Sequence, residues 1–417
     1  MARADRFAST ARRGEWTKAP MTDALCELLC TCARGTGLAL AHELKALGAV
    51  DVVDEGSVVV ARGGLDLVAR ANVFLRTASR VLLVLQRFDG VATPDDLIDA
   101  LSRVPFEERL DGKGTFCVDV HLDNVPWNNS LYAAQRTKDV VVDRLRALGR
   151  GRPTVDTQRP HVRFVLSWRG SRAVLSIDTS GDALHKRGYR AGVEGRAPLR
   201  ETLAAAILAL GHADVERPFL DPCCGTGTLA IEQAWRALRR APGRDRRFGF
   251  ERWSHRPPAL DRALALARTE ARDLERANLP APVHASDWHP EALDAVTRCV
   301  EQAGLQDHVV LERVDARRAA MPGERPVVCA NLPFGERLAP QRLQLEGFHR
   351  TLGDRMTEID GARVLFFSAA PDARWWLDLD RRSAGKPRRW SLFAGELPAQ
   401  LYRWDMSSRA PRVEDAG

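Results

Sequence analysis

A glycine-rich turn between a short apolar strand and a helix restricts the fold of this chain more than any other feature. The turn begins at Asp221 and continues as Pro222-Cys223-Cys224-Gly225-Thr226-Gly227-Thr228. Residues 219–220 before it predict the end of a buried strand, and residues 229–238 predict the helix that follows. Gly225 and Gly227 allow positive backbone dihedral angles, so a ligand can approach the main chain there. At the strand end, Asp221 can bind a cationic amine.

A dinucleotide site is the competing interpretation of this turn. The run Gly225-x-Gly227-x-x-Ala230 fits the fingerprint of such sites. That fingerprint requires an acidic residue at the end of a second strand about 20 residues further on. The only candidate is Asp245, which lies in a segment predicted to be a loop. The dinucleotide interpretation is therefore the weaker one.

A second motif follows the apolar run Val327-Val328-Cys329 and is Ala330-Asn331-Leu332-Pro333-Phe334-Gly335-Glu336-Arg337. An aspartate-initiated glycine turn followed by a strand ending in Asn-x-Pro-Phe resembles the class I S-adenosylmethionine-dependent methyltransferases that act on exocyclic amines. The resemblance implies S-adenosylmethionine as cofactor. It also implies an α/β, Rossmann-like fold with a seven-stranded, mostly parallel sheet and one reversed edge strand. The apolar segments from Phe219 to Trp404 give this number of strands.

The resemblance assigns cofactor contacts to residues at the predicted strand ends: Asp221, Gly225, Gly227, Asp287, Asp315 and Asn331. Asp287 ends the strand expected over 283–287, where such enzymes bind the two ribose hydroxyls with a carboxylate. A cap for the following helix is its alternative role. Asp315 follows the strand expected over 309–314, so its carboxylate would lie near the adenine amine.

The predicted catalytic residues are Asn331, Leu332, Pro333 and Phe334. A guanine or adenine amine is a poor nucleophile because its lone pair is delocalised into the ring. If the Asn331 side-chain oxygen and the Leu332 carbonyl accept its two hydrogens, the nitrogen can become pyramidal and direct its lone pair at the methyl group. Pro333 fixes the backbone, and Phe334 stacks on a base taken out of its helix, worth about 1 to 3 kcal/mol. A structural turn is the alternative interpretation of the motif.

The first 180 residues alternate short strands and helices, which predicts an α+β region. This region resembles the N-terminal ferredoxin-like segment and THUMP domain of RNA-modifying enzymes. The resemblance rests on Cys32-Ala33-Arg34-Gly35, Ala78-Ser79-Arg80-Val81-Leu82, Gly114-Thr115-Phe116, residues 138–144 and Leu175-Ser176-Ile177-Asp178-Thr179-Ser180-Gly181. Together with the catalytic half, the chain resembles the ribosomal RNA guanine methyltransferases of the RlmL type over about residues 32–406.

The family uses this module to hold structured RNA, and a net charge of +7 suits such a partner. The predicted RNA contacts are Lys138, Arg144, Lys186, Arg187 and Arg190. A solvated helix face explains Lys138 and Arg144 equally well. The basic runs over 186–200 and 236–252 flank the catalytic half, and each fits a solvated surface as well as it fits RNA.

We divide the chain into a disordered basic tail (1–22), a ferredoxin-like segment (23–80), a THUMP RNA-binding domain (81–181), a methyltransferase domain (182–406) and a second tail (407–417). Within the methyltransferase domain we expect a helix over 198–210, with Pro198 in its first turn, and a helical insertion over 258–277.

Composition narrows the location of the protein. No run approaches about 18 uncharged apolar residues, so no membrane span is expected. The first 20 residues lack the apolar core of a secretory signal. The cysteines, 8 in all, have no spacing suited to zinc. Reduced thiols in a cytoplasmic protein, with no metal, are therefore expected.

The leading hypothesis is methylation of the guanine 2-amino group, most simply in large-subunit ribosomal RNA. Related enzymes usually carry Pro-Pro where this chain has Leu332-Pro333, which leaves base preference open. Asn-Leu-Pro-Phe also resembles THUMP-containing transfer RNA guanine methyltransferases. Methylation of the adenine 6-amino group follows the same chemistry. A noncatalytic RNA-binding assembly factor is the fourth hypothesis, and the intact Asp221, Gly225, Gly227 and Asn331 argue against it.

Overall fold

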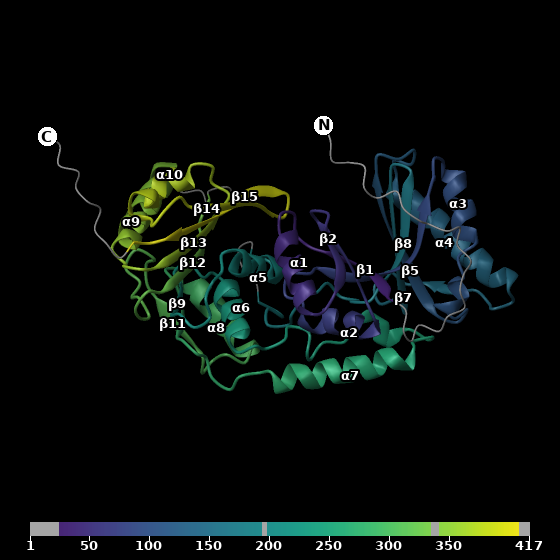
Figure 1. The fold of residues 1–417 in the computed structure, drawn as a ribbon, viewed down its shortest axis with the longest axis horizontal. Coiled ribbons are helices and arrows are strands. Elements are labelled where there is room, and N and C mark those ends of the chain that lie inside the picture. Colours follow the sequence, from purple (N-terminus) through teal and green to yellow (C-terminus); the bar gives the residue numbers. More distant parts are fainter. Residues whose placement is uncertain (1–24, 194–197, 335–341, 408–417) are drawn as a thin grey trace.

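The computed structural model describes residues 25–193, 198–334 and 342–407. Two sheets with their helices lie side by side, and helix α7 (Pro258–Asp273) runs along the lower edge in Figure 1. The tail expected over 1–22, most of the tail over 407–417 and the motif residues Gly335, Glu336 and Arg337 lie outside the described residues. Among the described helices, none has the length and apolar character needed to span a membrane.

The N-terminal sheet has eight strands in the order β2-β3-β1-β4-β8-β7-β5-β6. Their bounds are β1 (Cys26–Thr31), β2 (Val50–Asp54), β3 (Val58–Gly63), β4 (Arg80–Asp89), β5 (Thr115–Asp123), β6 (Thr154–Val155), β7 (Val162–Arg169) and β8 (Arg172–Asp178). The helices are α1 (Gly37–Ala46), α2 (Leu65–Phe74), α3 (Pro94–Ser102) and α4 (Ser130–Ala147), with a short turn η1 (Phe106–Glu108). Strand β4 pairs with β1 and β8, so one sheet runs through the ferredoxin-like and THUMP regions.

Local sequence signals explain where several of these elements begin and end. Helix α3 starts with a capping box: the Thr93 side chain accepts from the Asp96 N–H, and the Asp96 carboxylate accepts from the Thr93 N–H. The turn Arg169-Gly170-Ser171 joins β7 and β8 as an antiparallel hairpin.

The C-terminal sheet has seven strands in the order β11-β10-β9-β12-β13-β15-β14, which confirms the predicted number. Their bounds are β9 (Phe219–Asp221), β10 (Val283–Asp287), β11 (Val309–Arg313), β12 (Val327–Asn331), β13 (Arg363–Ser368), β14 (Arg388–Ala394) and β15 (Leu397–Asp405). The five neighbouring strands β11, β10, β9, β12 and β13 are parallel to one another. Strand β15 is antiparallel to its neighbours β13 and β14. The expected position of the reversed strand at the edge is wrong. Because the tight β14–β15 hairpin returns to β13, β15 lies inside the sheet and β14 is the edge strand.

The helices of this half are α5 (Glu201–Leu210), α6 (Thr228–Ala237), α7, α8 (Pro290–Gln302), α9 (Arg342–Thr357) and α10 (Ala373–Leu377), with short turns η2 (Gly249–Arg252) and η3 (Leu379–Arg382). Helix α5 begins at Glu201, and the expected start at Pro198 is wrong because the intervening Arg200 is extended, with ψ of 139°. Helix α7 packs on α2, and Glu270 of α7 pairs with Arg70 of α2 at 2.8 Å. The helical insertion therefore ties the catalytic half to the N-terminal half.

A buried polar cluster also joins the two halves. Arg187 forms an ion pair with Glu232 of α6, and the two side chains are 1% and 0% exposed. Tyr189 donates to the same carboxylate at 3.0 Å. The Arg187 guanidinium also donates to the backbone carbonyl of Arg76, whose own N–H donates to Glu43 on α1. The segment between the sheets is thus held by charge pairing inside the protein.

Replacing Glu232 with alanine is expected to lower the free energy of unfolding by about 3 to 5 kcal/mol, because it leaves the Arg187 guanidinium buried without a counter-charge. Urea denaturation followed by tryptophan fluorescence measures the change. The control is Glu358→Ala, which removes a 65% exposed carboxylate paired with Arg355 at 3.0 Å. It should change the free energy by less than about 1 kcal/mol. Equal effects of the two substitutions would contradict a structural role for the buried pair.

Candidate functional site

A large cleft opens where the parallel strands of the C-terminal sheet end. Strands β10, β9 and β12 are neighbours, so the residues at their carboxyl ends, Asp287, Asp221 and Asn331, meet at one edge of the sheet. The cleft has a volume of about 2500 Å³, well above that of an ordinary small-molecule pocket. Its lining includes these residues of the predicted site: Asp221, Gly225, Asp287, Asp315, Asn331, Leu332, Pro333 and Phe334. The cleft has room for a cofactor and for part of a larger substrate.

The two glycines of the turn have different roles. Gly225 lines the cleft, its φ is +53°, and a β-carbon there would meet nothing within 4 Å. Gly227 is the N-cap residue of helix α6, with φ of +75°, and a β-carbon there would lie 2.4 Å from a methyl group of Val296. Gly225 is therefore accessible to a ligand, whereas Gly227 is needed for the shape of the turn and its packing on α8.

Asp287 connects the turn to strand β10. One carboxylate oxygen accepts from the Gly225 N–H at 3.0 Å, and the other accepts from the His289 N–H at 3.0 Å. Helix α8 has His289, not Asp287, at its N-cap. The alternative role of Asp287 as a helix cap is therefore wrong. Its carboxylate lines the cleft and is oriented by two backbone N–H groups.

Asp221 is the most deeply buried charge at the cleft, with 1% of its surface exposed. Burial raises the pKa of its carboxyl well above the usual range; the Cys223 N–H, 3.3 Å from the carboxylate, lowers this pKa, and the Asp287 charge raises it. No ion pair compensates the Asp221 charge among the described residues. A cationic ligand group in the cleft would supply that compensation.

Asn331 ends strand β12 with an unusual side chain. Its Oδ1 atom is buried and has no hydrogen-bond partner within the described structure, and such orphan atoms are rare in folded proteins. The next residue, Leu332, is 0% exposed, and its N–H donates to the Phe367 carbonyl at 2.9 Å. Phe334 is half-buried against α9 and α10. Both predicted acceptors are thus shielded from solvent, so a base can reach them only after a local movement of the protein.

Asp315 lies in the turn after β11, at the rim of the cleft. Arg317 donates to both carboxylate oxygens, one of them at 2.8 Å. Hydrogen bonds from Arg317 lower the pKa of this carboxyl. The carboxylate is therefore charged, and a ligand amine would compete with Arg317 for it.

Three domain families match the chain in order: an RlmL ferredoxin-like domain over residues 27–82, a THUMP domain over 91–178 and an RMKL-like methyltransferase domain over 187–381. The catalytic half therefore belongs to the RMKL-like methyltransferase family, and it follows an RlmL-type ferredoxin-like domain and a THUMP domain. The predicted fold class is confirmed: a ferredoxin-like and THUMP region is followed along the chain by an α/β methyltransferase domain.

Individual relatives agree with this membership. The ribosomal RNA large subunit methyltransferase K/L of Syntrophotalea carbinolica is 35% identical over 399 residues, which are 93% of this chain and 54% of the relative. The chain spans about half the length of the curated relatives it matches.

Solved structures share the whole architecture. SMU.472, provisionally described as a methyltransferase and complexed with SAH, is 25% identical with a TM-score of 0.82 and covers 94% of this chain and 100% of that chain. A Listeria monocytogenes protein described as a predicted N6-adenine-specific DNA methylase is 29% identical with a TM-score of 0.80 and covers 91% and 96%.

The basic residues proposed to contact RNA have very different surroundings. The prediction for Arg187 is wrong, because its guanidinium is buried and paired with Glu232. Arg190 donates to both oxygens of Glu201 at 3.0 and 2.8 Å, which neutralises its charge. Contact between Arg190 and RNA stays a prediction, with Glu201 as a competitor.

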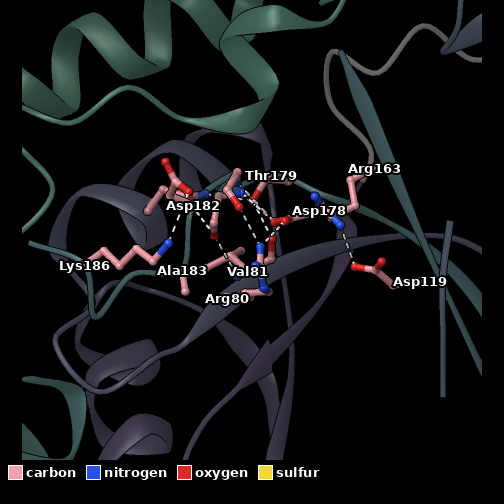
Figure 2. Close-up of polar contacts among 12 residues, drawn as sticks. Arg80, Val81, Asp119, Arg163, Asp178, Thr179, Asp182, Ala183 and Lys186 are labelled. Carbon is pink, nitrogen blue, oxygen red and sulfur yellow. Dashed lines mark hydrogen bonds and ion pairs between the residues drawn. The ribbon is translucent and has the colours of Figure 1, made fainter. Parts of the chain in front are cut away.

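The remaining candidates are more accessible. Figure 2 shows Lys186 pointing toward Asp182, at 3.8 Å, beside the network around Arg80 and Asp178. Arg144 on α4 donates to both oxygens of Glu107 at 3.1 and 2.8 Å. Lys138 lies on the same helix and is half-buried. RNA contacts by Lys138, Arg144 and Lys186 stay predictions.

The arginine run over 236–252 is mostly occupied inside the protein. Arg246 donates to the backbone carbonyls of Asp182, Ala183 and Lys186, and Arg240 binds Glu275 at 2.7 Å. These arginines link segments of the chain, and their charge is largely unavailable to a partner.

Several cleft residues were not predicted from the sequence. Trp288, directly after Asp287, lines the cleft and is 61% exposed, with the Arg313 guanidinium 5.9 Å from its ring centroid. A tryptophan next to a strand-terminal carboxylate is a signal that the sequence does contain. Arg34 and Phe393 also line the cleft, but they come from distant parts of the chain and no local pattern links them.

Asp221→Asn is expected to stabilise the free protein at neutral pH. Folding raises the pKa of this carboxyl, so the wild-type protein becomes less stable as the pH rises from the unfolded-state pKa, about 3.9, through the folded-state pKa. The amide of the variant does not titrate, so the variant does not lose this stability. The gain in free energy of unfolding should therefore be small at acid pH and grow as the pH rises. Urea denaturation from about pH 3.5 to pH 7.5 measures it. A variant less stable than wild type at neutral pH would contradict an uncompensated buried charge.

Proposed function

We propose that this chain is an S-adenosylmethionine-dependent RNA methyltransferase of the cytoplasm that methylates the 2-amino group of a guanosine in large-subunit ribosomal RNA. The observation that carries the proposal is Asn331, whose buried, unpartnered oxygen lies at the end of β12 in the cleft that Asp221 and Asp287 also line. The relatives named as ribosomal RNA large subunit methyltransferases and the match to a THUMP domain support it.

The cleft suits S-adenosylmethionine in charge and in shape. The buried Asp221 carboxylate fits a cationic amino group, and the Asp287 carboxylate fits a pair of ribose hydroxyls. The exposed Trp288 ring would cover the adenine, and Asp315 would accept from the adenine amine. Because Gly225 has no side chain, the cofactor could approach the main chain closely at this residue. When bound, this cofactor supplies an electrophilic methyl group on a sulfonium.

The chain's own part in the reaction is to hold a nucleobase amine and prepare its lone pair. Asn331 Oδ1 and the Leu332 carbonyl accept the two amine hydrogens, so the nitrogen becomes pyramidal. Phe334 stacks on the extruded base. Asn331 and Leu332 would thereby hold the amine nitrogen with its lone pair toward the methyl group that the cofactor would supply, and the nitrogen would release its extra proton to water. Positioning supplies most of the acceleration.

The leucine at position 332 is compatible with this role. Its side chain is buried in a cluster with Ala316, Val328 and Leu352, and its N–H is fixed by Phe367. The peptide is therefore held from two sides, as a proline would be held by its ring. The shielded acceptors require local opening for the base, which is common for enzymes that close around their substrates.

A second candidate is methylation of the adenine 6-amino group. The similarity to the Listeria monocytogenes protein described as a predicted N6-adenine-specific DNA methylase favours it. The two acceptors at Asn331 and Leu332 would serve that amine equally well.

Nucleoside mass spectrometry distinguishes these functions. Total RNA from a strain lacking the gene is incubated with purified protein and isotope-labelled S-adenosylmethionine, and each RNA species is then digested separately. We expect labelled N2-methylguanosine in large-subunit ribosomal RNA. If only transfer RNA is labelled, the substrate is transfer RNA and not ribosomal RNA. If methyladenosine is the only product, the guanine assignment is rejected. No product and no calorimetric binding of S-adenosylmethionine would leave a noncatalytic RNA-binding factor.

Two substitutions should separate catalysis from cofactor binding. Asn331→Ala is expected to lower the rate of transfer at least about 100-fold, because a positioned hydrogen-bonding group at the reacting atom is lost, while cofactor affinity stays near that of wild type. Asp287→Ala is expected to weaken cofactor binding about 10-fold or more, because charged hydrogen bonds are lost. The control is Asp294→Ala, which removes an exposed carboxylate from α8. Calorimetry and single-turnover rates measure both effects, and equal loss of both functions in each variant would contradict the division of roles.

A further inference from the structure

The cleft has a second group of lining residues that the proposed reaction does not use. Ala33, Arg34 and Ser79 come from the N-terminal half, and residues 393–398 come from the hairpin between β14 and β15. The motif Cys32-Ala33-Arg34-Gly35 therefore reaches the cleft from outside the methyltransferase domain.

The loop that carries this motif is held firmly against the edge strand of the C-terminal sheet. Gly35 has φ of +86°, and a β-carbon on it would lie 2.2 Å from the Ser391 carbonyl of β14. The Thr36 hydroxyl donates to the Ala33 carbonyl at 2.7 Å, which closes the loop on itself. Only glycine fits at position 35, so the position of Arg34 is set by packing of backbone on backbone.

Arg34 is oriented by an aromatic ring and keeps its hydrogen-bond donors free. Its guanidinium carbon lies 4.2 Å from the centroid of the Phe393 ring, which is the distance of a cation–π contact. The residue is exposed, and among the described residues it has no hydrogen bond or ion pair. Glu396 at the tip of the same hairpin lines the cleft and is not paired with it. By contrast, the cleft residue Arg317 donates from two of its nitrogens to Asp315.

A planar guanidinium that is charged, preoriented and without a partner is suited to a phosphate group, which accepts two of its N–H donors at once. We propose that Arg34, held by Phe393, binds a backbone phosphate of the RNA strand that delivers the target nucleotide to the cleft. Phosphate contacts position the strand and carry no sequence information. This inference rests on the proposed function and makes the N-terminal half part of the substrate site.

Filter binding of purified large-subunit ribosomal RNA at several KCl concentrations tests the contact without requiring methyl transfer. Arg34→Ala is expected to weaken RNA binding about 5- to 10-fold and to make the slope of log affinity against log salt shallower by about 0.7 to 0.9, the loss of one phosphate contact. Arg34→Lys should keep the slope, because the charge remains, and lose part of the affinity. Phe393→Leu should likewise keep the slope and weaken binding. Affinity for S-adenosylmethionine should stay within about twofold of wild type in all three.

The matched control is Arg62→Ala on β3, which removes a 50% exposed arginine of the same half that does not line the cleft. An equal salt slope and affinity for the Arg34→Ala and Arg62→Ala proteins would overturn the proposal. So would a loss of cofactor affinity and thermal stability in the Arg34→Lys protein that matches its loss of RNA binding, since that indicates a structural role. The wild-type protein could bind RNA, and the Arg34 substitutions could change that binding as expected, while the wild-type protein forms no methylated nucleoside. In that case the proposed reaction fails and the phosphate contact stands.

Discussion

The adjacency of strands β10, β9 and β12 is the constraint on which the rest of this structure depends. Parallel neighbours end at the same edge of a sheet, so segments far apart in the chain bring Asp287, Asp221 and Asn331 to one cleft. The strands themselves are short and buried, which leaves little freedom for these side chains. Two features of the cleft are costly for the free protein: a buried carboxylate without a counter-charge and a buried amide oxygen without a donor. Both become favourable when a cationic ligand and a nucleobase amine are present.

The N-terminal half packs directly against the catalytic half. The hydrogen bond from Arg187 to the Arg76 carbonyl, the Arg70–Glu270 pair and the contact of Gly35 with β14 connect the two halves at separate places. A module that served only to capture RNA at a distance would need no such contacts. Their effect is to fix Arg34 beside the cleft, so that binding of the strand and presentation of the base are coupled by geometry.

The sequence predicted those parts of the site that local patterns specify. The glycine turn, the carboxylate that ends β10, the carboxylate after β11 and Asn331 each combine a strand end with a polar residue. All of them lie where the fold brings strand ends together. The prediction failed where partners come from another element. Arg187 looked like a surface cation because Glu232, which neutralises it, is 45 residues further along the chain, on helix α6. The arginines over 236–252 were ambiguous because their acceptors are mostly backbone carbonyls of distant segments. The position of β15 depends on how a hairpin returns to the sheet, which strand patterns alone do not encode.

The central claim is that Asn331 Oδ1 and the Leu332 carbonyl hold the exocyclic amine of a base during transfer. The most direct measurement is a crystal structure of the protein with a nonreactive S-adenosylmethionine analogue and an RNA oligonucleotide carrying the target nucleotide. We expect the amine nitrogen to lie about 2.7 to 3.2 Å from both oxygens, after a local movement of the protein has opened the way to them. A base bound in the cleft with Asn331 Oδ1 still buried, and more than about 5 Å from the amine, would be well beyond hydrogen-bond distance and would contradict it.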